Sequence, residues 1–334
     1  VVPGFHKRAA LPAVPLFRTI FPRLLSFKLM VEYSIGVDLG GTNLRAAAVS
    51  RDGKLLQKVS ASTPVNAGRD AVIEGIASAI EALRQELGRN GLAGVGVGIP
   101  GFILMDEGVV AGAPNLPDFV NYPVRDAIEQ RLGARVVLEN DANAAALGEK
   151  RMGAGRDVND LILLTLGTGI GGGIISAGKV LRGARGMAAE LGHITVVPNG
   201  NPCGCGNTGC VEKYASATAV SAMAKLLNLG RDLSAEEVFD LAKSGNERAQ
   251  SIFMTVGSSL GILLAGLINT FNFPLYLLGG GMAAAWELFE APMIAELKKR
   301  SFSYRNFPVR IERAVLGSDA GLFGAACLPM ESSL

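Results

Sequence analysis

A strand, a turn rich in glycine and threonine, and a second strand follow one another twice in this chain, about 130 residues apart. The first copy covers residues 33–49 with its turn at 39–43, and the second has a strand at 161–166 and a turn at 167–173. Glycine lets the backbone N–H groups of such a turn approach an anion closely, because it has no side chain. The two hairpins therefore predict an α/β protein with two similar halves, each with a turn suited to a phosphate group.

The second turn also matches the dinucleotide-binding pattern G-x-G-x-x-G, and Glu190 stands at about the distance of a ribose-binding acid. That pattern requires a helix after the turn, whereas residues 174–181 are rich in β-branched side chains and contain Gly178, which indicates another strand. A Walker-type site is excluded because the chain has no G-x-x-x-x-G-K-[ST] sequence. In the first hairpin, Asp38 at the strand end could hold Mg²⁺ directly or through water.

Three of the four cysteines, Cys203, Cys205 and Cys210, lie within eight residues, and His193, one of two histidines, precedes them by ten. One histidine and three thiolates form the closed tetrahedral set of a structural zinc site. The alternative is a cysteine-rich loop without a metal. Disulfides fit poorly, because Cys203 and Cys205 are too close to bridge easily and Cys327 stands alone in an apolar segment. We therefore predict a zinc knuckle with acids at both ends of the segment 186–212.

Asn140 and Asp141 stand where a strand runs into an alanine-rich helix. A helix cap needs only one such residue, whereas two at the C-terminal edge of a strand lie where α/β sheets place ligands. This position favours a site, in which Asp141 would suit a general base. Asn115, between two prolines, is equally compatible with a turn and with a ligand contact.

The remaining pattern alternates helices and strands. Apolar residues at helical spacing predict helices at 70–87 and 211–227, and Ser234 with Glu237 opens a further helix through a capping box. A strand at 275–278 runs into a third glycine turn at 279–281. After an amphipathic helix at 285–300 and a strand at 309–314, a closing helix is expected from 318 to 327, capped by Ser318 or Asp319.

Composition excludes several classes of protein. The net charge of +2 comes from residues 1–30, which hold five basic residues and no acid, so the rest lacks the basic surface of a nucleic-acid binder. Residues 249–286 carry no charge and include a stretch long enough to span a membrane. Because serine, threonine and asparagine interrupt it and no basic cluster flanks it, we interpret it as a buried helix. Neither membrane nor nucleic acid is an expected partner, and reduced cysteines fit a cytoplasmic protein.

Residues 1–30 combine scattered arginines and prolines without a lasting helix or strand period. A transit peptide has this composition. A translation start assigned too far upstream is the simpler explanation of the same composition. We expect a basic extension that is disordered or not native.

The order of these features resembles the ROK family of sugar kinases and repressors, from about residue 33 to residue 328. The resemblance is strongest in the pairing of Glu-x-Gly-His (190–193) with Cys-x-Cys-Gly-x-x-Gly-Cys-x-Glu (203–212). It implies a two-lobed actin-like ATPase (ribonuclease H-like) fold with an interlobe cleft and a structural zinc knuckle. Residues 31–140, completed by a C-terminal helix at 318–330, would form the small lobe, and residues 141–317 the large lobe with the zinc site.

The resemblance also implies a role for each predicted site residue. The general base would be Asp141, and Asp38 the Mg²⁺-associated acid. The phosphate turns would be Gly40, Gly41 and Thr42, and Gly167, Thr168 and Gly169, with Gly280 and Gly281 beside the adenosine of ATP. The sugar hydroxyls would meet Asn115, Asn140, Glu190, His193 and Glu212, and zinc would be held by His193, Cys203, Cys205 and Cys210. Two positions depart from the family, which often has a long residue at Asn43 and glycine at Ala189.

The implied activity is ATP-dependent phosphorylation of a hexose primary hydroxyl, with glucose as the expected hexose. Kinases for N-acetylglucosamine, N-acetylmannosamine, fructose or allose are alternatives within the family. Its sugar-responsive repressors carry a helix-turn-helix ahead of this domain, and the short, aperiodic segment before residue 33 argues against a DNA-binding role. We expect a homo-oligomer, either a dimer or a tetramer.

Overall fold

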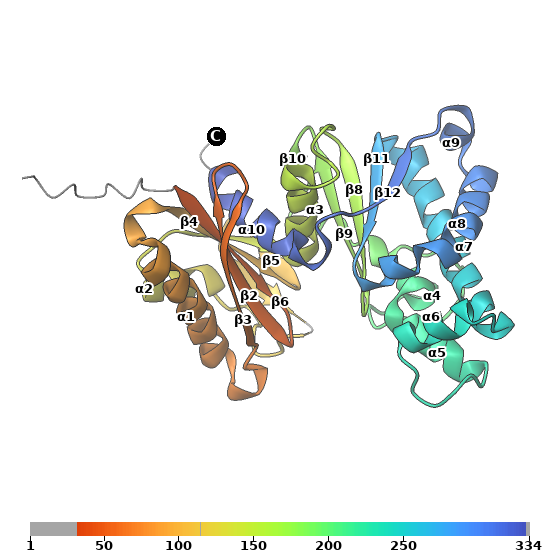
Figure 1. Cartoon of the computed structure of the whole chain (residues 1–334), viewed down its shortest axis with the longest axis horizontal. Coiled ribbons are helices and arrows are strands. Elements are labelled where there is room, and N and C mark those ends of the chain that lie inside the picture. Colours follow the sequence, from red (N-terminus) through yellow and green to blue (C-terminus); the bar gives the residue numbers. More distant parts are fainter. Residues whose placement is uncertain (1–31, 114, 332–334) are drawn as a thin grey trace, which may run out of the picture. The chain divides into compact units, whose positions relative to one another are not determined.

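The computed structural model describes residues 32–113 and 115–331. The predicted extension at residues 1–30 lies outside the described residues. Two five-stranded sheets carry the fold (Figure 1). The first has the order β3-β2-β1-β4-β7 and the second the order β10-β9-β8-β11-β12.

The two sheets repeat one plan. The strands of the first are β1 (Tyr33–Leu39), β2 (Asn43–Ser50), β3 (Leu55–Ser62), β4 (Leu92–Ile99) and β7 (Val136–Asn140). Those of the second are β8 (Leu161–Leu166), β9 (Ile170–Ser176), β10 (Lys179–Val180), β11 (Leu275–Gly279) and β12 (Arg310–Arg313). In each sheet the first three strands along the chain are antiparallel and the last two are parallel. The predicted pair of similar halves is therefore confirmed.

Two helices lie between the sheets (Figure 1): α3 (Asp141–Met152) and α10 (Ala320–Glu331). They pack on each other; α10 also packs on β1 and β4, and α3 on β8 and β9. Their close approach depends on Gly148 and Gly324. A side chain at Gly324 would begin 1.6 Å from the carbonyl oxygen of Ala144, and one at Gly148 would begin 2.2 Å from that of Ala320. A larger residue at either position would push α10 away from α3.

The outer face of the first sheet is covered by α1 (Arg69–Leu87) and α2 (Val124–Leu132), whose apolar residues join its core. A separate two-stranded sheet, β5 (Phe102–Leu104) with β6 (Val109–Gly112), follows β4 and lies near the site described below. Ile103 points into this core, whereas its neighbour Phe102 is exposed.

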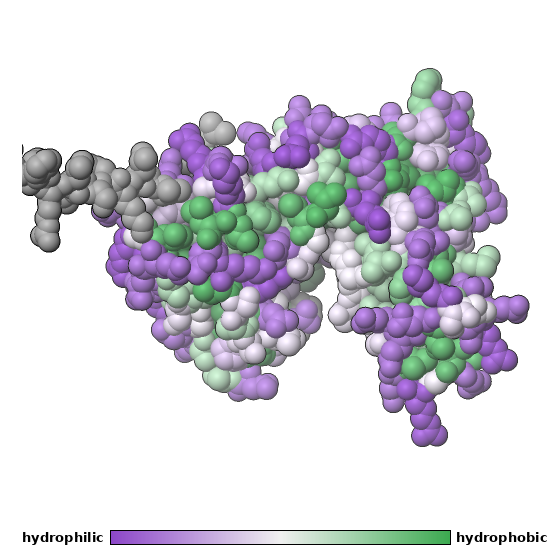
Figure 2. All heavy atoms as spheres, viewed as in Figure 1, coloured by the Kyte–Doolittle hydropathy of each residue, from purple (hydrophilic) through white to green (hydrophobic). Residues whose placement is uncertain are grey.

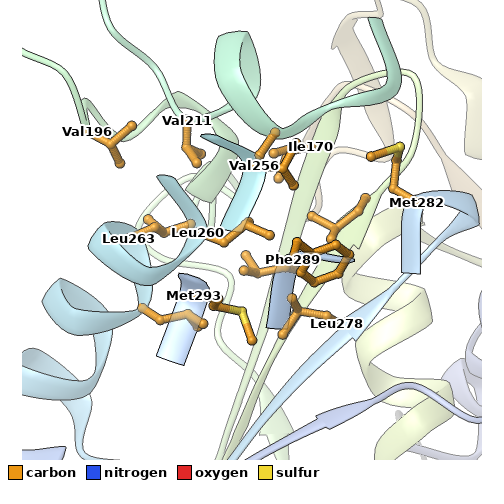
Figure 3. Close-up of a cluster of buried hydrophobic side chains, with 14 of the residues drawn as sticks. Ile170, Val196, Val211, Val256, Leu260, Leu263, Leu278, Met282, Phe289 and Met293 are labelled. Atoms are coloured by element: carbon orange, nitrogen blue, oxygen red, sulfur yellow. The ribbon is translucent and has the colours of Figure 1, made fainter. Parts of the chain in front are cut away.

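Helices α4 to α9 accompany the second sheet. They are α4 (Glu212–Ala215), α5 (Ala217–Leu226), α6 (Ala235–Lys243), α7 (Glu247–Phe271), α8 (Trp286–Arg300) and α9 (Phe302–Asn306). Figure 3 shows Leu260 and Leu263 of α7 in one cluster with Phe289 and Met293 of α8 and with Leu278 of β11.

By length and composition, α7 alone among the helices of the described residues could cross a membrane. Of its most apolar 18-residue window, 67% is buried, and its apolar residues form part of the main core. We therefore identify α7 as a core helix, which confirms the buried helix predicted from the uncharged residues 249–286.

Three predicted boundaries are wrong. The second glycine turn, expected at 167–173, is shorter, because β9 begins at Ile170 and pairs with β8 through residues 170–173.

The single helix expected at 211–227 is divided into α4 and α5 at Ser216, whose hydroxyl accepts a hydrogen bond from the Ala219 N–H and caps α5. The Ala217 N–H then donates to the carbonyl of Gly167, which a continuous helix would prevent. The closing helix begins at Ala320 after a 3₁₀ turn over Gly317–Asp319. Instead of a helix cap, the Asp319 carboxylate accepts a hydrogen bond from Lys58 Nζ at 2.6 Å.

Candidate active site

A cavity of about 380 Å³ lies between the ends of β4 and β7 and the turn that joins β8 to β9. Figure 2 shows the surface hollowed between the two sheets. Nine of the predicted site residues line the cavity: Asn115, Asn140, Asp141, Gly167, Gly169, Glu190, His193, Glu212 and Gly280. The structure thus brings together residues from six separate segments of the chain.

A second cavity, of about 170 Å³, adjoins the first and is lined by Asp38, Gly280 and the segment that leads into α10. Asp141 lines both cavities. Other predicted residues lie outside both linings: Gly40, Gly41, Thr42, Thr168 and Gly281. The first turn is nevertheless beside the larger cavity, because a side chain at Gly41 would begin 3.1 Å from the Cβ atom of Asn115.

Asp141 is the first residue of α3, directly after the cap residue Asn140. The Asn140 side chain accepts hydrogen bonds from the N–H groups of Ala142 at 2.9 Å and Asn143 at 3.2 Å, and it donates to the Gly101 carbonyl at 3.3 Å. Asn140 therefore caps the N-terminus of α3, in addition to any contact with a ligand. By closing the helix end, it places the Asp141 carboxylate at the junction of the two cavities.

The environment of Asp141 raises the pKa of its carboxyl from 3.8 to about 6. Burial is the largest cause, and the negative charges of Asp38 and Glu190 add to it, while the N–H of Ala142 opposes it. Such a carboxylate is ionised at neutral pH but is a stronger base than an exposed aspartate. This combination is suited to proton abstraction from a substrate hydroxyl.

Two further acids and a histidine line the larger cavity together with Asp141. Glu190 precedes a short 3₁₀ turn that ends at His193, and Glu190 Oε2 lies 4.0 Å from His193 Nε2. Glu212 begins α4, and its Oε2 atom accepts a hydrogen bond from the Ile170 N–H at 3.0 Å. Burial raises the pKa of Glu190, with the charge of Glu212 adding to the effect and His193 opposing it. Two carboxylates that line one cavity can accept hydrogen bonds from several hydroxyls of one small polyol.

The predicted zinc residues form one cluster in which the four ligand atoms all lie within 4.8 Å of one another. Cys203 Sγ is 3.6 Å from His193 Nδ1, and Cys205 Sγ is 3.7 Å from Cys210 Sγ. Tetrahedral Zn²⁺ with bonds near 2.3 Å requires ligand separations of about 3.8 Å, so this donor set fits the metal. With Nδ1 directed to the cluster, Nε2 of His193 faces Glu190. Cys327, the remaining free cysteine, is buried in α10.

Asp38 has a partner that the sequence reasoning missed. It forms an ion pair with Arg45, which also lies 3.6 Å from Asp319, itself bound to Lys58. The two residues are directly opposite in the β1–β2 register. A tight hairpin fixes that register, so pairing residues outward from the Gly-Gly-Thr turn could have found Arg45.

The sequence profile of the ROK family matches residues 34–331. The glucokinase of Thermotoga maritima is 40% identical over 310 residues, which cover 89% of this chain and 97% of that protein. Among solved structures, the ROK hexokinase of Thermus thermophilus has a TM-score of 0.80 at 36% identity, over 90% of this chain and 99% of that chain.

A ROK family glucokinase from Streptomyces griseus, solved in complex with glucose and AMPPNP, has a TM-score of 0.76 at 36% identity, with the same two coverages. The repeated sheets and the cavity between them thus define a sugar kinase with the actin-like ATPase fold. The chain belongs to the ROK family.

Proposed function

We propose that the protein is a glucokinase that transfers the γ-phosphoryl group of ATP to the primary hydroxyl of glucose. The observation that carries this proposal is the position of Asp141, a base with a raised pKa that lines both cavities. The larger cavity, with its two acids and a histidine, suits a sugar. The smaller one, with Asp38 and Gly280, suits the phosphates of a nucleotide. The glucokinases among the similar proteins support the same activity.

In this mechanism Asp141 accepts the proton of the primary hydroxyl as the oxygen attacks the γ-phosphorus. The new P–O bond forms while the bond from the γ-phosphorus to the leaving ADP oxygen breaks. In phosphoryl transfer the protein contributes mainly by positioning the reactants and by stabilising charge. A positioned base contributes about 10²- to 10⁴-fold to the rate, and Asp141 is placed to supply that part.

The glycine turns would hold the phosphates through their backbone N–H groups. The turn at Gly167–Gly169 is fixed from behind, because the carbonyl of Gly167 accepts from the Ala217 N–H and that of Thr168 from the Thr218 hydroxyl. Asp38, held by Arg45, would position Mg²⁺, which when bound neutralises charge on the phosphate oxygens. Gly280 and Gly281 would lie beside the adenosine. A side chain at Gly280 would begin 2.4 Å from the Leu166 carbonyl, so this turn has room for glycine only.

The sugar hydroxyls would be bound by Glu190, His193 Nε2, Glu212, Asn115 and Asn140. Zinc, held by Cys203, Cys205, Cys210 and His193 Nδ1, would act indirectly by fixing the segment that carries these groups. We also propose that residues 31–140 with 318–330 and residues 141–317 are two lobes that close over the substrates and exclude water. A cytoplasmic location would keep the zinc thiols reduced.

A sugar panel tests the proposal. Glucose, N-acetylglucosamine, N-acetylmannosamine, fructose and allose are assayed with ATP, and glucose also with ADP and polyphosphate as donors, each with and without a zinc chelator. We expect glucose with ATP to give the highest kcat/KM and the chelator to raise the KM for glucose. A higher kcat/KM for an N-acetylated sugar would replace glucose as the substrate, and no transfer to any sugar would overturn the kinase proposal.

A further inference from the structure

Glu139 lies two residues before the base Asp141 and is fully buried at the end of β7. Its carboxylate accepts three hydrogen bonds: from the Asn140 N–H at 3.0 Å, from Asn143 Nδ2 at 3.2 Å and from Arg182 Nε at 2.7 Å. Glu139 and Arg182 also form an ion pair that joins the first sheet to the second. A buried carboxylate is stable only when it is paired and hydrogen-bonded, so Glu139 confines the guanidinium of Arg182 to one position.

Arg182 follows β10 and begins the segment that leads to the proposed sugar-binding residues. Its carbonyl accepts a hydrogen bond from the Ala188 N–H at 3.1 Å, which closes the intervening residues into a loop. Two glycines in the left-handed region, Gly183 at φ 70° and Gly186 at φ 75°, allow the loop to turn. Glu190 follows Ala188 by two residues, so the bond to the Arg182 carbonyl is one of the contacts that hold the segment leading to Glu190 and His193.

One ion pair therefore connects strand β7, which leads into the proposed base Asp141, to the loop that leads into the proposed sugar-binding residues. We propose that Glu139 and Arg182 are a positioning pair that fixes the Glu190–His193 segment relative to Asp141. This inference rests on the proposed kinase function. Neither side chain lines the two cavities described above, so the pair acts through the residues it holds.

The pair predicts a specific kinetic change in Arg182→Gln. The glutamine cannot neutralise Glu139, so the loop loses its attachment to β7. Small displacements of a substrate-positioning group cost up to about 100-fold in rate. We expect kcat/KM for glucose to fall about 10- to 100-fold, mainly through KM, because binding groups held by the loop serve ground state and transition state alike. The KM for ATP should change less than about twofold.

Arg185→Gln is the matched control, since Arg185 lies in the same loop, is exposed and forms no ion pair within the described residues. It should retain the glucose KM of the original protein. Arg182→Lys keeps the charge and should recover part of the loss. Zinc content and melting temperature are measured for every variant, so that loss of the fold is recognised separately.

Glu139→Gln tests the pair by changing the acceptor. The N–H group of the glutamine amide would face the N–H group of Arg182, and two donors cannot form a hydrogen bond. The single variants and the Glu139→Gln/Arg182→Gln double variant form a cycle, in which coupled residues are non-additive. We expect the double variant to be no worse than the poorer single one. Additive losses, or equal glucose KM values in Arg182→Gln and Arg185→Gln, would overturn the pair. Calorimetric measurement of glucose binding gives the same comparison without turnover, so a failure of the kinase proposal is recognised independently.

Discussion

Glu212 accepts a hydrogen bond from the backbone N–H of Ile170, with 3.0 Å between Oε2 and N. Ile170 is the first residue after the glycine turn proposed to bind phosphate, and Glu212 follows the zinc-cluster residue Cys210 by two positions. Cys203 Sγ in turn lies 3.9 Å from Oε1 of the same glutamate. A single carboxylate thus connects the cysteine–histidine cluster, the larger cavity and the turn at residues 167–169.

Gly169→Ala should disrupt this connection. The added Cβ atom would lie 2.4 Å from Glu212 Oε2, which forces the carboxylate away from Ile170. We expect kcat/KM for glucose to fall at least about tenfold, since displaced positioning groups cost up to about 100-fold. Steady-state kinetics for glucose and ATP measure the effect. Gly266→Ala in α7, where the new methyl group meets no atom within 4 Å, is the control and should match the original protein.

Cys205→Ser should remove the zinc and weaken glucose binding. Cys205 is the exposed cysteine of the cluster, and a serine hydroxyl is a poor zinc ligand because it remains protonated. Without the metal, His193 and Glu212 lose their fixed positions, so the KM for glucose should rise more than the KM for ATP. Metal analysis and kinetics on the same preparations measure both effects.

The control for that experiment is Cys327→Ser, which changes a buried cysteine remote from the cluster. It should keep about one zinc per chain and an unchanged glucose KM. An unchanged KM in zinc-free Cys205→Ser would mean that the metal stabilises the fold without positioning the sugar-binding residues.

Local patterns predicted much of this fold. The two hairpins were visible because strand alternation and glycine turns depend on neighbouring residues, and the Ser234 capping box is present as expected. The break at Ser216 was not visible, because apolar spacing continues through it. What ends α4 there is partly a tertiary contact, the bond from the Ala217 N–H to Gly167, about 50 residues earlier in the chain.

The candidate site was predictable only where chemistry and spacing coincide. The cysteines and His193 have a spacing that zinc explains. Arg182 and Glu139 have no such signal, since 43 residues separate them and each is an ordinary charged residue in its own segment. Their pairing follows from the packing of one sheet against the other through α3, which the sequence does not reveal residue by residue.

Ala189→Gly should stabilise the protein. Ala189 has φ 70°, directly before Glu190, and an L-residue other than glycine costs about 1–2 kcal/mol in that region. The substitution also makes the unfolded chain more flexible, which opposes the gain by about 0.4–1 kcal/mol. We expect the free energy of unfolding to rise by about 0.5–1 kcal/mol, measured by denaturant titration.

Ala188→Gly is the control for Ala189→Gly, because its φ is not in the left-handed region. It should lower the free energy of unfolding by about 0.5–1 kcal/mol. Glycine at this position makes the unfolded chain more flexible and relieves no strain in the folded protein. Equal destabilisation by both variants would show that the backbone at Ala189 is not strained.

Asp141→Asn should abolish phosphorylation while retaining the fold and the zinc. Loss of the base should lower kcat by about 10²- to 10⁴-fold. Because the folded protein raises the pKa of this carboxyl, the charged form opposes folding: its cost is absent below about pH 4 and complete above about pH 6. The variant should therefore melt at a higher temperature than the original at pH 7.5, with the difference shrinking toward pH 4. Near-normal turnover would exclude Asp141 as the base.

The pH dependence of kcat/KM for glucose should report the titration of Asp141 in the free enzyme. Only the ionised carboxylate can accept the hydroxyl proton, so kcat/KM should fall about tenfold per pH unit below about 6. Glu190→Gln removes one of the negative charges that raise this pKa, so its acid limb should move to lower pH although its rate is reduced. A limb near pH 4 in the original protein would show that Asp141 titrates as an exposed aspartate. In that case the burial and the neighbouring acids would not be what prepares it for catalysis.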